Sequence, residues 1–170
     1  FTDILLEVLY ADDNDGNLVN GTPNDIAIIQ AFATHGITLL SNAVINHTPI
    51  SLVNANSNIG ISANIQLTYA WALGNANCSY RLNTDTNWVA AAMIQSGTNF
   101  SVQLPAQPGG TIIAYYISLE DNFGMQAGVT PFSAHKSPIC FANVPYFTLV
   151  GYELQQEEDF DFNVGNWQTS

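Results

Sequence analysis

The sequence predicts a mainly β fold: an immunoglobulin-like or fibronectin-III-like antiparallel β-sandwich preceded by a short helical hairpin. From residue 49 onward, apolar residues recur with a period of two, and the strand-like runs are separated by clusters of Asn, Gly and Pro. Before residue 49, the apolar residues instead have helical spacing. With 170 residues and 47% hydrophobic content, the chain can bury one main core.

Two helices are expected before the sandwich. In residues 3–10, four apolar side chains share one helical face: Ile4, Leu5, Val8 and Leu9. The second helix is expected to begin with Thr22 as N-cap and Pro23 at the first helical position, and to stop at Gly36. Two such helices cannot bury their apolar stripes alone, so we expect residues 1–48 to be the tail of a larger upstream domain.

An acidic loop, residues 11–20, joins the two expected helices. Its sequence ADDNDGNLVN is rich in residues that form turns. Its side-chain oxygens and that of Asp25 suit calcium, and the candidate ligands are Asp12, Asp13, Asp15, Asn17 and Asp25. The spacing departs from an EF-hand, in which Ala11 and Thr22 would occupy the first and last ligand positions. Two interpretations are open: a structural calcium or similar ion, or a solvated loop that caps the helices.

Seven short strands are predicted between residues 49 and 151. Alternation is clearest in one of them, where the apolar positions are Ile65, Leu67, Tyr69 and Trp71. The other six are residues 51–54, 78–82, 89–94, 100–104, 111–119 and 146–150. No helical period interrupts them, which is typical of an antiparallel sandwich.

The formal net charge is −12, and the two basic residues are Arg81 and Lys136. No basic patch is available for phosphates or anionic lipids, so we expect no nucleic-acid or membrane partner. The acidic residues gather at both ends, around a nearly neutral body. We therefore expect three parts: the hairpin of residues 1–48, a sandwich of residues 49–151, and a linker that begins a further β-domain at residues 152–170.

Cysteines and aromatic residues leave alternatives open. Cys78 and Cys140 are too far apart for a CxxC pair, and they form either one disulfide or two buried thiols. A sugar-stacking platform requires several aromatic rings on one exposed face; otherwise these rings belong to the core. The candidates are Tyr69, Trp71, Tyr80, Trp88, Tyr115 and Tyr116. Tyr115 and Tyr116 are consecutive in a predicted strand, so they must point to opposite faces.

Three stretches resemble secreted bacterial zinc metallopeptidases with several domains. ADDNDGNLVNGTPNDIAIIQAFATHGI resembles the end of their catalytic domain, and SYRLNTDTNWVAAAMIQSGTNFSVQLPAQPGGTIIAYYISLEDNFG resembles their sandwich modules. EEDFDFNVGNWQTS is similar to the start of a jelly-roll module. No HExxH occurs, and His35, His47 and His135 lack the spacing of a zinc pair. The resemblance implies a secreted fragment without a zinc site of its own.

Two hypotheses for function follow. The first is a non-catalytic accessory domain of a secreted metallopeptidase, which serves as spacer, stabiliser or weak substrate-docking module beside the flanking domains of the parent protein. The alternative is an extracellular module that binds carbohydrate or protein. Exposed, coplanar aromatic rings would favour the alternative.

Overall fold

A computed structural model describes residues 1–131 and 144–153. In chain order, the described elements are α1 (Thr2–Asp12), the 3-10 helix η1 (Leu18–Asn20), α2 (Asp25–Ala33), β1 (Val44–Asn46), β2 (Leu52–Val53), β3 (Ile59–Gln66), the 3-10 helix η2 (Ala70–Ala72), β4 (Leu73–Leu82), β5 (Val89–Ala92), β6 (Ile94–Ser96), β7 (Asn99–Leu104), β8 (Ile112–Asp121), β9 (Gln126–Thr130) and β10 (Tyr146–Val150). Neither α1 nor α2 is long and apolar enough to cross a membrane.

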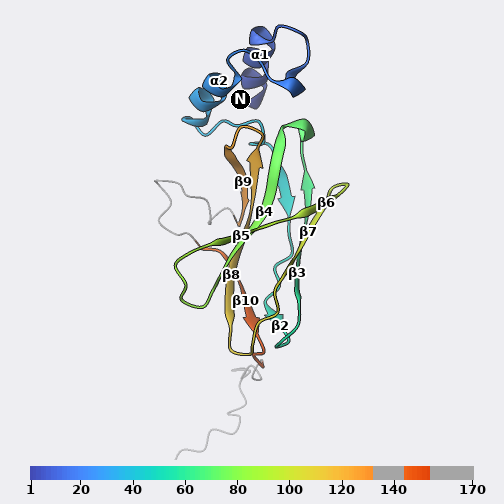
Figure 1. The fold of residues 1–170 in the computed structure, drawn as a ribbon, viewed down its shortest axis with the longest axis vertical. Helices are drawn as coiled ribbons and strands as arrows, with labels where there is room; N and C mark the ends of the chain where they lie inside the picture. The colour runs from blue at the N-terminus through green and yellow to red at the C-terminus, as the bar shows by residue number, and fades with distance from the viewer. Residues whose placement is uncertain (132–143, 154–170) are drawn as a thin grey trace, which may run out of the picture.

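The strands form two sheets, which confirms the predicted mainly β sandwich behind a helical hairpin (Figure 1). One sheet has the order β1-β3-β7-β6, and the other has the order β2-β10-β8-β4-β5, with β9 also paired to β8. All of these pairings are antiparallel except that of β2 with β10, which is parallel. β9 pairs with the second half of β8 and β10 with its first half.

The period-two pattern of β3 begins earlier than the sequence suggested. Its buried positions are Ile59, Ile61, Ala63 and Ile65, and the strand ends at Gln66. The prediction that this strand continues through Tyr69 and Trp71 is wrong, because Tyr69 is the N-cap of η2 and Trp71 lies within η2. There the Tyr69 hydroxyl donates a hydrogen bond to Asp3 Oδ1 at 3.1 Å, so this segment contacts the hairpin instead of extending the sheet.

Five other strands differ clearly from expectation. β4 begins at Leu73, five residues before the predicted start at residue 78. The predicted strand 89–94 is split into β5 and β6, which belong to different sheets and are separated by Met93. β1 and β9 were not predicted, since β1 is three residues long and β9 contains Gly128 within five residues. β1 pairs with β3, so the sheets begin before residue 49.

The hairpin contains both expected helices, with one corrected start. α2 begins at Asp25 and not at Thr22-Pro23, because Thr22 and Asn24 bind the end of α1 instead. Gly36 terminates the second helix as predicted: its φ is +72°, and its N–H donates to the Ala33 carbonyl at 2.9 Å. The Ile37 N–H donates to the Phe32 carbonyl at 3.1 Å, which completes a Schellman motif.

One hydrophobic core joins the hairpin to the sandwich. Leu5 and Leu9 of α1 and Ile29 of α2 belong to the same buried cluster as the inner faces of both sheets. Figure 1 shows the hairpin at one pole of the elongated molecule and the end of β10 near the opposite pole. The hairpin and the end of β10 therefore lie at opposite ends of the sandwich (Figure 1).

Candidate functional site

The first candidate site is the acidic loop, in which Asp12 connects the two helices. Its Oδ2 accepts hydrogen bonds from Thr22 Oγ1 and the Asn24 N–H, both at 2.7 Å. Its Oδ1 accepts one from Asn24 Nδ2 at 2.7 Å. Hydrogen bonds from these donors lower the pKa of Asp12, and the bond from the Asn24 side chain has the largest effect. Asp12, the last residue of α1, thus fixes the segment that leads into α2.

The other predicted ligands bind within the loop or at the start of α2. Asp13 Oδ1 accepts from the Asp15 N–H at 3.3 Å, and Asn17 Oδ1 accepts from the Val19 N–H at 3.2 Å. Asp15 accepts from the Asn17 N–H at 3.0 Å and, with its other oxygen, from Asn20 Nδ2 at 2.7 Å. The side-chain bond from Asn20 is the main cause of the lowered pKa of Asp15.

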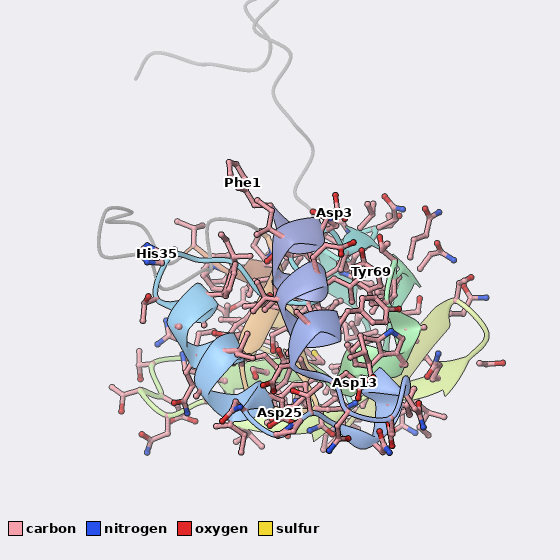
Figure 2. All side chains as sticks on the ribbon, turned by 90° about the horizontal axis from the view of Figure 1, so that it is seen from above. Phe1, Asp3, Asp13, Asp25, His35 and Tyr69 are labelled. Atoms are coloured by element: carbon pink, nitrogen blue, oxygen red, sulfur yellow. The ribbon has the colours of Figure 1, made fainter. Side chains whose placement is uncertain are left out.

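The Asp25 carboxylate also accepts a backbone hydrogen bond, from the Thr22 N–H to Oδ2 at 3.2 Å. Figure 2, a view from the hairpin pole, shows Asp13 and Asp25 near the end of α1 that lies away from Phe1. Within residues 1–131 and 144–153, no group of three His, Cys, Asp or Glu side chains is arranged to hold a metal ion. The hydrogen bonds support the loop-capping interpretation, and calcium binding stays a prediction.

The second candidate site is an apolar stripe on the outer face of α1, formed by Phe1, Ile4 and Val8. These side chains follow a helical spacing of three and four residues. They are 87%, 53% and 37% exposed, respectively. The sequence placed Ile4 and Val8 on the same buried face as Leu5 and Leu9, but only the latter two are buried. Two of the four predicted apolar side chains, Leu5 and Leu9, are therefore buried, and the α1 stripe stays exposed.

The third candidate site, the arginine–tryptophan surface, consists of Arg81, Trp88 and Tyr116. The Arg81 guanidinium carbon lies 4.7 Å from the centroid of the Trp88 ring. The Trp88 and Tyr116 rings are 4.8 Å apart at an interplanar angle of 72°. All three side chains are half-buried. A flat cation thus lies against one of two perpendicular aromatic rings.

The remaining aromatic candidates do not join this surface. Tyr115 is fully buried, whereas Tyr116 is half-buried, which confirms that the two side chains point to opposite faces. Tyr69, which Figure 2 shows near Asp3 of α1, packs against the hydrophobic core, as do Trp71 and Tyr80. No coplanar aromatic platform of the predicted kind forms among the described residues. Sequence reasoning included Trp88 and Tyr116 among the aromatic candidates but gave Arg81 no role, since a lone arginine carries no spacing signal.

A groove of about 560 Å³ lies between the end of α2 and β9. Small or uncharged side chains line it, among them Ala33, Ala43, Ile45 and Gly128. Its polar lining consists of the hydroxyl groups of Thr38, Ser41 and Thr130 and the amide of Gln126, and no Asp, Glu, His, Cys or Lys side chain lines it to act as their base. Cys78 lies elsewhere, fully buried in β4, where burial raises the pKa of its thiol to about 12 and makes it inert. Cys140 lies outside the described residues.

No family model matches the sequence, and no curated protein matches it. Among solved structures, the chain is similar to one titled "Crystal structure of Br derivative BhCBM56". The sequence identity is 11%, the match covers 52% of this chain and 82% of that chain, and the TM-score is 0.34.

Proposed function

We propose that the chain is a non-catalytic accessory module of a secreted multidomain protein, a spacer that holds the domain before it at a fixed position. The observation that carries this proposal is the exposed α1 stripe at the hairpin pole, opposite the pole at which β10 ends (Figure 1). Exposed apolar side chains gathered on one element commonly mark a contact surface. The stripe lies where a preceding domain would attach.

The chemistry of the stripe suits contact with a folded domain. Burying a fully exposed Ile or Val side chain contributes about 1.5–3 kcal/mol. Ile4 and Val8 are 53% and 37% exposed, so contact with a second domain would add roughly half of that for each and would favour one orientation of the two domains. Asp3 and Glu7 lie beside them on α1 and are exposed. An apolar centre with a charged rim is the usual anatomy of a protein interface. We infer that the partner surface offers an apolar patch bordered by hydrogen-bond donors or cations.

The resemblance to secreted zinc metallopeptidases suggests what the preceding domain is. In this proposal the zinc ligands and the general base belong to that domain, while the present chain positions it and carries no chemistry of its own. Structural calcium in the acidic loop belongs to the same proposal and is tested separately below.

Replacing Ile4 and Val8 with Gln tests the proposal. Gln keeps good helix propensity, so the 170-residue chain should retain its melting temperature, because both side chains are exposed. In the longer parent protein, the same pair should uncouple the unfolding of the preceding domain from that of the sandwich. Leu5→Gln is the matched control: Leu5 is 0% exposed, so this variant should destabilise both proteins. Unchanged coupling in the parent protein would refute the spacer role.

The alternative function, an extracellular module that binds carbohydrate or protein, is favoured by one observation. The arginine–tryptophan surface joins a planar cation to two accessible aromatic rings on the nearly neutral body of the molecule.

A further inference from the structure

Arg81 is the one Lys or Arg side chain within residues 1–131 and 144–153, yet it forms no ion pair with any residue there. Its Nε is buried and has no hydrogen-bond partner. A buried donor without a partner costs free energy comparable to a lost hydrogen bond, and in a native structure it calls for an explanation. A surface ligand cannot reach this nitrogen, but the terminal nitrogens of the same guanidinium group also have no hydrogen-bond partner among the described residues, and they are the donors that a ligand could reach.

Trp88 orients this cation. The guanidinium carbon lies over the Trp88 ring, 4.7 Å from its centroid, and Tyr116 in turn packs against Trp88. The N–H donors of Arg lie in one plane and can bond both oxygens of a carboxylate. A guanidinium group that is already held in place loses less conformational entropy when it binds. Arg81 is therefore prepared to take a carboxylate.

The surrounding sheet face provides a shallow floor. In the strand register, Arg81 lies opposite Ala114 of β8, and Ala114 lies opposite Phe147 of β10. Ala114 has only a methyl group, whereas Phe147 is 49% exposed beyond it. Ser79 lies opposite Tyr116 in the same register and is buried, as is Ala114. The accessible groups of this face are therefore Arg81, Trp88, Tyr116 and Phe147.

An extended peptide fits this surface poorly. Peptides that pair through their main chain need a free strand edge or a groove. β4 lies between β8 and β5, and β8 lies between β4 and the strands β9 and β10, so neither has a free edge. Among the described strands, the free edge on this side of the sheet is that of β5, which contains none of the three residues of the surface. The described groove lies elsewhere, beside β9. A compact ring that bears a carboxylate suits a flat face better.

We propose that Arg81, Trp88 and Tyr116 bind one uronic acid residue of an acidic polysaccharide. The carboxylate accepts hydrogen bonds from Arg81, and the sugar ring packs against the accessible parts of Trp88 and Tyr116. The 72° angle between the two rings limits the contact to a single sugar. The acidic ends of the chain are separated in sequence from this neutral body, and salt screens charges over about 8 Å at physiological ionic strength.

The proposal is tested by titrating the 170-residue chain with tetragalacturonate. Arg81 is the sole arginine of the sequence, so its Nε–H gives a single arginine signal in a proton–nitrogen correlation spectrum. This signal should shift and saturate, with a dissociation constant of about 1 mM, as expected for one small contact. Neutral maltotetraose and a tetraglutamate peptide serve as comparison probes, and each should bind at least about tenfold more weakly.

Variants assign the binding to these residues. Arg81→Gln and Trp88→Ala should each weaken tetragalacturonate binding about tenfold by calorimetry. Arg81→Lys retains the charge and the aliphatic stem but not the planar fork, and it should lose affinity as well. Ile94→Gln, at an exposed site of the other sheet, should bind like the unaltered chain. Equal binding of the neutral sugar or of the peptide, undiminished binding by Arg81→Lys, or no binding at all would overturn the proposal.

Discussion

At the scale of single residues, a polar network ties the first loop of the sandwich to its core. His47 Nδ1 lies 2.6 Å from the Ser62 carbonyl oxygen, and His47 Nε2 lies 2.9 Å from the Tyr115 hydroxyl. The Ile50 N–H donates to the same hydroxyl at 3.3 Å. The tautomer that donates from Nδ1 and accepts at Nε2 gives each of these groups a hydrogen-bond partner. Burial raises the pKa of Tyr115 to about 12, so the hydroxyl keeps its proton.

Tyr115→Phe should lower the free energy of unfolding by about 1–3 kcal/mol, because Ile50 N–H and His47 Nε2 lose their shared partner. Urea denaturation measures this change. Tyr116→Phe is the matched control, since that hydroxyl has no hydrogen-bond partner among the described residues and the side chain is half-buried. It should change the free energy of unfolding by less than about 0.5 kcal/mol. Equal effects of the two substitutions would contradict the network.

The Asp121 carboxylate is held in a turn in which one of its oxygens is bonded and the other is buried without a partner. Its Oδ1 accepts hydrogen bonds from Phe123 N–H at 3.0 Å and Met125 N–H at 2.9 Å, which close the turn between β8 and β9. Its Oδ2 is buried without a hydrogen-bond partner. Burial raises the pKa of Asp121 above its ordinary value of 3.8, although the two backbone bonds oppose this shift. The charged form is therefore disfavoured in the folded chain.

Because the folded-state pKa lies above the unfolded one, Asp121 loses stabilising free energy as the pH rises from about 4 through the folded pKa. Asp121→Asn removes this titration and keeps an oxygen for both backbone bonds. Relative to the unaltered chain, the variant should therefore gain stability as the pH is raised from 3 to 7. Urea denaturation across this range provides the measurement, with Glu120→Gln as the control. A constant difference between Asp121→Asn and the unaltered chain would contradict the assigned titration.

At the scale of elements, local signals predicted the strands that carry their own pattern. β10 was predicted with its observed bounds, and Gly36 ends the second helix as its position suggested. The start of α2 could not be predicted, because Asp12 lies twelve residues before Asn24 and binds it through tertiary contact. The same limit applies to the His47–Tyr115 pair, which joins residues 68 positions apart. The α1 stripe shares its helical period with the buried face, so the pattern could not separate the two.

The acidic loop yields a prediction at this scale. Asp12→Ala should lower the melting temperature of the 170-residue chain, since three hydrogen bonds that join α1 to the start of α2 are lost. Asp13→Ala, which removes only one contact at 3.3 Å, should leave it nearly unchanged. The pKa of Asp12 is lowered, so its stabilising effect should be present at neutral pH and disappear as the pH falls below about 4.

Calcium is tested in the same melting experiment. If hydrogen bonds alone hold the loop, a chelator and 1 mM calcium, on the order of extracellular calcium-module affinities, should give the same melting temperature. A specific ion would instead raise it by mass action. A clear rise with calcium that disappears in Asp15→Asn would contradict the self-capped loop and support the predicted metal ligands.

At the scale of the whole molecule, the arrangement of the two poles gives the chain its proposed role. The hairpin belongs to the same hydrophobic core as the sandwich, so it is a firmly attached end and not a loose tether. Tyr69 and Asp3 add a polar contact at this junction (Figure 2). A domain that rests on the α1 stripe would therefore be held in a fixed relation to the long axis of the sandwich.

The exposure of the α1 stripe in two contexts tests this account most directly. Methyl signals of Ile4 and Val8 should be strongly broadened by a soluble paramagnetic probe in the 170-residue chain. In a protein that also contains the proposed preceding domain, the account predicts that both signals are protected. Ile94, 75% exposed on β6, should be broadened in both proteins and serves as the reference. Equal broadening of Ile4 and Val8 in the two proteins would contradict the proposed contact with a preceding domain.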